Sequence, residues 1–79
     1  MESLSKVKQD LTLMLLYLNS WEENGFYPVK RSWKGYDFGD LDSLIEQEFI
    51  DGKRSSKSVY FSEKGVEEAE RLLREYKLL

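Results

Sequence analysis

Apolar residues recur at helical spacing in the first quarter of the chain and predict a helix over residues 5–20. One stripe along this helix consists of Leu4, Val7, Leu11, Leu15 and Leu18. Four further apolar residues lie off the stripe: Leu13, Met14, Leu16 and Tyr17. A helix that is apolar on more than one side is either central in its own core or covered by a partner. The first interpretation is the simpler one, and the second makes the four off-stripe residues a candidate partner interface.

The next segment is aromatic and contains strong turn residues. Asn24-Gly25 favours a turn, and Pro28 blocks continuation of a helix. Alternation of side chains from Val29 to Lys34 then predicts a short strand. Six of the eleven aromatic residues fall between Trp21 and Phe38. The simpler interpretation is that they close one end of a small core, and the alternative is that they stack on nucleic-acid bases.

The second half of the chain predicts helix, strand, strand and helix. Asp37 is a good N-cap for a helix over 37–47, and Ser62 is a good N-cap for the last helix. Between these helices, Phe49-Ile50 and Ser58–Phe61 read as two strands joined by turns. We therefore predict one α+β domain over residues 1–79, winged-helix-like, with the order helix–strand–helix–strand–strand–helix and a small antiparallel sheet.

Composition narrows the chemistry. The 79 residues include no cysteine and no histidine, which excludes disulfides, Cys/His zinc sites and Ser-His-Asp catalysis. We expect no metal, no cofactor, no small-molecule substrate and no enzymatic activity. No signal peptide opens the chain and no apolar run approaches the roughly 18 residues of a membrane span, so we expect a cytoplasmic protein without membrane contact.

Charge is distributed unevenly, although the net charge is only −3. Two compact basic clusters consist of Lys30, Arg31 and Lys34 and of Lys53, Arg54 and Lys57. Between them, residues 37–48 carry five acidic residues and no basic one. If the strands bring the basic clusters together, the resulting ridge could contact phosphates or a minor groove. The alternative is that these charges are solvated and keep an exposed strand edge from pairing with other chains.

Residues 44–69 resemble the wing region of bacterial winged-helix regulators. In those proteins a ribbon is followed by a Leu-Thr-Glu-x-Gly motif that opens a helix, and Phe61-Ser62-Glu63-Lys64-Gly65 occupies that position here. The resemblance covers about a third of the chain. It implies a winged-helix fold and, for most such proteins, DNA binding.

A longer resemblance is to a family of small bacterial proteins with no established activity. Four segments carry it: LLYL at 15–18, RSWKGYDF at 31–38, LDSL at 41–44 and KSV at 57–59. It implies a shared fold and gives no function. Related sequences often have glycine where this chain has Glu48. A glycine there favours a left-handed helix end, so Glu48 either adopts that strained conformation or the helix ends differently.

Two functions from different classes follow from these patterns. In a standard winged helix the helix over 37–47 would enter the major groove, but its carboxylates would repel phosphates. The first hypothesis is therefore a nucleic-acid-binding, regulatory module that contacts phosphates of DNA through the basic wing. The second is a protein-interaction module, a homodimer or a partner-binding domain, with no nucleic-acid role.

Overall fold

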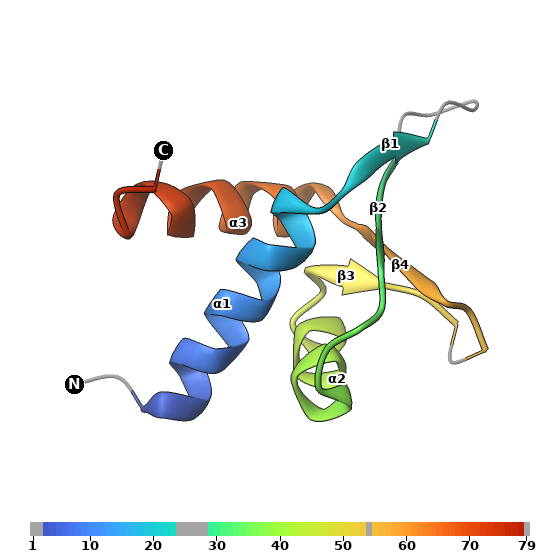
Figure 1. The fold of residues 1–79 in the computed structure, drawn as a ribbon, viewed down its shortest axis with the longest axis horizontal. Coiled ribbons are helices and arrows are strands. Elements are labelled where there is room, and N and C mark those ends of the chain that lie inside the picture. The colour runs from blue at the N-terminus through green and yellow to red at the C-terminus, as the bar shows by residue number, and fades with distance from the viewer. Residues whose placement is uncertain (1–2, 24–28, 54, 79) are drawn as a thin grey trace.

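The structure is a computed structural model that describes residues 3–23, 29–53 and 55–78 (Figure 1). Its elements, in chain order, are α1 (Leu4–Leu18), β1 (Trp21–Glu23), β2 (Val29–Trp33), α2 (Phe38–Glu46), β3 (Ile50–Asp51), β4 (Ser58–Phe61) and α3 (Glu63–Glu75). The predicted α+β class and the predicted helices and strands are confirmed, with β1 as an additional strand. The predicted turn at Asn24-Gly25 and Pro28 lies outside the described residues.

Among the described residues the sheet is antiparallel, with four strands in the order β1-β2-β4-β3. The arrangement of β2, β4 and β3, with a helix between β2 and β3, is compatible with a winged-helix topology. Between β2 and β3, where every residue is described, α2 is the only helix. The strands β3 and β4 pair as a hairpin, with Ile50 opposite Phe61 and Asp51 opposite Tyr60, and we call this the β3–β4 hairpin.

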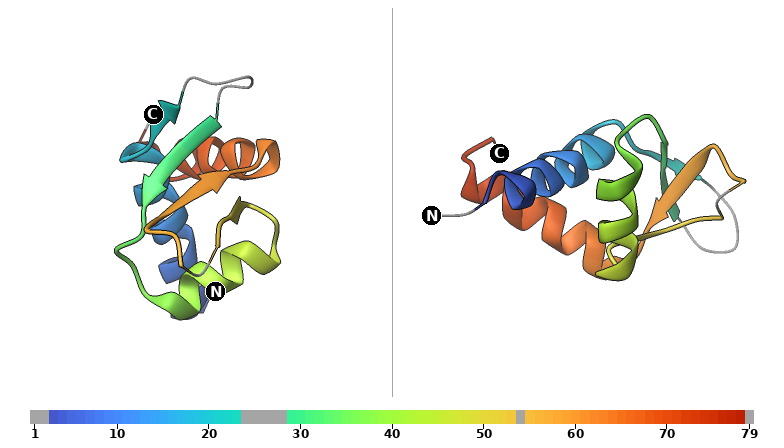
Figure 2. Two further views of the ribbon diagram at one scale, coloured as in Figure 1. Left: turned by 90° about the vertical axis from the view of Figure 1, so that its right-hand side faces the viewer. Right: turned by 90° about the horizontal axis from the view of Figure 1, so that it is seen from below.

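The helices cover one face of the sheet (Figure 2). Val59 and Phe61 of β4 and Ser32 of β2 are buried on that face. Side chains alternate between the two faces of a strand, so Arg31, Trp33 and Tyr60 point to the opposite face. We call this opposite side the open face. The helix α1 crosses the molecule between α3 and α2 and contacts both.

The most deeply buried side of α1 carries the apolar residues that lie off the predicted stripe. Leu13, Met14 and Leu16 are at most 2% exposed and belong to the core, whereas Leu4 is 86% exposed and Leu18 58% exposed. Leu13, Met14 and Leu16 are buried within the chain itself, as expected for a helix that is central in its own core, because α2 and α3 cover them. Tyr17, the fourth off-stripe residue, is half-buried and packs against the same core. Both sides of α1 are apolar, so spacing alone did not decide which side faces inward.

Two helix ends adopt the left-handed conformation on residues other than glycine. At the end of α2 the N–H of Glu48 donates to the Ile45 carbonyl (2.9 Å) and that of Phe49 to the Leu44 carbonyl (3.0 Å), which is the Schellman pattern. Glu48 has φ 66°, so the first of the two predicted alternatives holds. Lys77 repeats this arrangement after α3 with φ 60°.

Candidate nucleic-acid interface

The structure brings three of the predicted basic residues together where β2 meets the β3–β4 hairpin. The backbone N–H of Lys34 donates to the Lys57 carbonyl (2.8 Å), and its Nζ donates to the Lys53 carbonyl (2.7 Å). The side chains of Lys53 and Lys57 are exposed. We call Lys34, Lys53 and Lys57 the lysine cluster. Arg54, predicted as part of the same ridge, lies outside the described residues.

Lys30 and Arg31 are separated from each other by the alternation of β2. Lys30 points to the helix-covered side, where its Nζ lies 5.0 Å from the centroid of the Tyr17 ring. Arg31 points to the open face, where Nη1 donates to Ser58 Oγ (3.1 Å) and the guanidinium lies 5.6 Å from the Tyr60 ring centroid. The predicted ridge is therefore split: Lys30 is not part of it, and Arg31 joins it from the open face.

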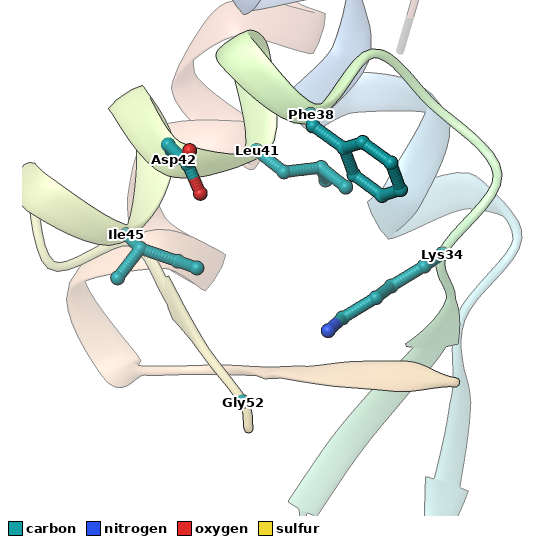
Figure 3. Close-up of a pocket in the computed structure, with 6 residues that line it drawn as sticks. All are labelled: Lys34, Phe38, Leu41, Asp42, Ile45 and Gly52. Carbon is teal, nitrogen blue, oxygen red and sulfur yellow. The ribbon is translucent and has the colours of Figure 1, made fainter. Parts of the chain in front are cut away.

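A groove separates α2 from the β3–β4 hairpin (Figure 3). Its lining residues are Lys34, Phe38, Leu41, Asp42, Ile45 and Gly52. The amino group of Lys34 points into this groove, and the α2 side chains lie across the groove from it (Figure 3). Because that amino group is also bonded to the Lys53 carbonyl, Lys34 holds the hairpin in position as well as contributing charge.

The helix α2 carries several acidic side chains, of which Asp42 lines the groove. Asp42 and Glu46 are exposed on α2, and Asp40 is buried near the start of the same helix. Lys8 Nζ of α1 lies 3.3 Å from Asp40 Oδ2 and 3.8 Å from Asp37 Oδ2. The exposed carboxylates of α2 would face the phosphates if this helix entered a groove of DNA, and their repulsion disfavours that orientation.

Aromatic side chains are more exposed than the simpler prediction required. Trp33 is 61% exposed on the open face, and Phe38 is 76% exposed at the start of α2. Tyr36 packs against the core. The prediction that these aromatic residues close one end of the core therefore holds for Tyr36 and is wrong for Trp33 and Phe38. Trp21, from the unpredicted strand β1, lies beside Trp33 with ring centroids 5.0 Å apart and planes tilted by 43°.

The described parts of the chain contain no group of three or more acidic side chains arranged to hold a metal ion. Within the same ranges, no helix combines the length and apolarity needed to cross a membrane. What the described residues do present is a small α+β domain with a lysine cluster at a hairpin and an aromatic open face. A family model described as a domain of unknown function (DUF6429) matches residues 5–78, so the chain belongs to this family. No curated protein and no solved structure matches the chain.

Proposed function

We propose that this protein is a non-enzymatic nucleic-acid-binding module that contacts phosphates through the β3–β4 hairpin. The observation that carries the proposal is the lysine cluster, in which Lys34 is hydrogen-bonded to the main-chain carbonyls of Lys53 and Lys57, 19 and more positions away in the chain. Arg31 and Lys53 line one concavity beside the hairpin, so a fourth positive charge lies close to the cluster. Several basic residues presented by one part of the surface can position a protein on a phosphate backbone.

The expected binding mode depends on charge rather than on base sequence. Phosphate contacts release counterions, so affinity falls steeply as salt concentration rises. In this binding mode the acidic helix α2 stays outside the grooves of the DNA, and the β3–β4 hairpin makes the contact. This arrangement favours a regulatory or architectural role in which sequence is not read through α2.

Charge reversal on the hairpin tests the proposal. In the Lys53→Glu/Lys57→Glu variant we expect loss of about tenfold or more in affinity for mixed-sequence duplex DNA at low salt, and a shallower salt dependence. The matched control is Arg74→Glu/Lys77→Glu, which makes the same change in net charge at the far end of α3 (Figure 1). No binding of the unmodified protein to duplex or single-stranded DNA at low salt, or an equal loss in both variants, would contradict the proposal.

A homodimer is the second candidate function, and the exposed side of α1 favours it. The exposed leucines of α1 are Leu4, Leu11, Leu15 and Leu18. Three of them, at positions 4, 11 and 18, are spaced by seven residues, the repeat that places side chains along the seam of a helix pair. A 79-residue core supplies only about 3–5 kcal/mol, so association would add stability. This face replaces the predicted one formed by Leu13, Met14, Leu16 and Tyr17.

A further inference from the structure

The open face of the sheet carries a flat set of aromatic and guanidinium groups. Register pairs Trp21 with Arg31 and Arg31 with Tyr60, so these three residues form one row across β1, β2 and β4. Adjacent strands are about 4.8 Å apart, so the row spans about 10 Å. Trp33 lies two residues beyond Arg31 on β2, about 6–7 Å along the strand.

These side chains hold one another in place and still expose ring surface. The two tryptophan rings are in contact at 5.0 Å between centroids, and Arg31 is bonded to Ser58 while lying against Tyr60. Trp33 remains 61% exposed and Tyr60 37% exposed. A large aromatic residue left this exposed is unusual on the surface of a domain with a small core, and exposed apolar patches mark binding surfaces.

We propose that the open face binds single-stranded nucleic acid by stacking unpaired bases on Trp33 and Tyr60. This inference rests on the proposed function and names the form of nucleic acid. Sheet-borne aromatics stack two or three unpaired bases in known modules, and guanidinium planes serve the same purpose. In a duplex, both faces of each base are covered by its neighbours, so a flat sheet face reaches only unpaired bases.

The basic residues around the open face favour a nucleic acid over an apolar partner. Lys53 borders the Arg31–Tyr60 concavity, and Lys57 borders a second concavity that contains Trp33 and Phe38. A strand whose bases lie on the rings would thus have its phosphates beside the lysine cluster. Asp51 is the acidic residue in the first concavity, and the Tyr60 hydroxyl donates to its Oδ2 (3.3 Å). A single carboxylate in a concavity with Arg31 and Lys53 leaves that edge positive.

Intrinsic fluorescence tests this inference directly, because the chain has two tryptophans and both lie on the open face. Titration with an unstructured oligothymidylate of about 12 nucleotides should quench the tryptophan signal to saturation. Base–aromatic stacking of about 1–3 kcal/mol per base predicts a roughly five- to 150-fold loss of single-strand affinity in Trp33→Ala. Trp33→Phe should retain most of the affinity because it keeps a ring. Tyr76→Ala is the matched control, an exposed aromatic at the far end of α3.

Parallel titrations with duplex DNA separate this inference from the proposed function. One outcome is that the protein binds duplex DNA through Lys53 and Lys57 while the oligothymidylate fails to quench its fluorescence. That result overturns base stacking on the open face and leaves the proposed phosphate contact in place. Absence of binding to either form overturns both. If Trp33→Ala leaves oligothymidylate binding unchanged, base stacking on the open face is overturned, even if charge reversal on the hairpin weakens that binding. A tryptophan signal that changes with protein concentration alone identifies the face as a self-association surface and also overturns it.

Discussion

Gly65, in the first turn of α3, lies directly against the backbone carbonyl of Phe49. A Cβ added to Gly65 would overlap the carbonyl oxygen of Phe49 and lie 2.7 Å from its carbonyl carbon. Ser62 completes this junction: its Oγ donates to the Glu48 carbonyl (2.6 Å) and accepts from the N–H of Gly65 (2.9 Å). The Ser-Glu-Lys-Gly segment thus fixes the start of α3 to the residue that precedes β3.

Gly65→Ala should therefore be strongly destabilising. Both contacting groups are backbone atoms, so a shift of α3 or of the β3 start is required, at a cost of about 2–4 kcal/mol. The matched control is Gly35→Ala, where an added Cβ would meet nothing within 4 Å, and its effect should stay within about 0.5 kcal/mol. Chemical denaturation of both variants measures the difference. Equal stabilities would show that the approach of Gly65 to Phe49 relaxes without cost.

Replacement of Glu48 by glycine should stabilise the protein. Glu48 has φ 66°, where a Cβ costs about 1–2 kcal/mol, and glycine removes that cost while adding entropy to the unfolded chain. We expect a net gain of about 0.5–1 kcal/mol in the free energy of unfolding. Glu48→Ala is the control, because it removes the carboxylate and keeps the strained backbone. If Glu48→Ala raises the free energy of unfolding as much as Glu48→Gly does, the gain comes from removing the charge and not from relieving the backbone conformation.

Tyr17 and Glu70 join α1 to α3 through a single hydrogen bond. The Tyr17 hydroxyl donates to Glu70 Oε2 at 2.6 Å, and this bond, together with burial and the negative charge of Glu70, raises the pKa of Tyr17 above its ordinary value of 10.0. The raised pKa means that the bond contributes its full stability below about pH 10 and loses it as the pH rises through the folded-state value.

Tyr17→Phe should therefore cost about 1 kcal/mol at neutral pH, since the bond to a carboxylate is partly exposed to solvent. The ring contact with Phe61, at 5.9 Å between centroids, is retained. The stability difference between wild type and variant should shrink above pH 10, and taking the difference removes the pH effects that the two proteins share. A difference that is constant from pH 7 to pH 11 would contradict a coupling through the hydroxyl.

Element types were predictable from the sequence because local signals agreed with the fold. Asp37 and Ser62 cap α2 and α3 as expected, with side-chain oxygens that accept from the N–H groups of Asp40 and Gly65. The strand β1 was missed, because three residues are too few to show alternation and its signal comes only from pairing with β2. Which side of α1 is more deeply buried could not be predicted, because leucines occupy both sides and only the packing of α2 and α3 selects one.

The candidate site was predictable in composition and not in arrangement. The lysines of the cluster were named from charge clustering, but Lys30 faces the Tyr17 ring because β2 alternates between two faces. Trp21 and Trp33 are twelve positions apart, and nothing in the sequence pairs them until β1 aligns with β2. The grouping of these residues on the open face therefore depends on the strand register, which the sequence pattern does not specify.

The exposed side of α1 gives the last prediction, which concerns oligomeric state. If Leu11 and Leu15, each 46% exposed, lie in a dimer interface, the protein should have a dimer mass in sedimentation and a melting temperature that rises with concentration. Leu11→Lys/Leu15→Lys should give a folded monomer, because neither side chain belongs to the core. Leu13→Asp should instead unfold the chain, since it places a carboxylate at a position that is 1% exposed. A wild-type monomer at high concentration, or a lysine variant that stays dimeric, would exclude this surface as the interface.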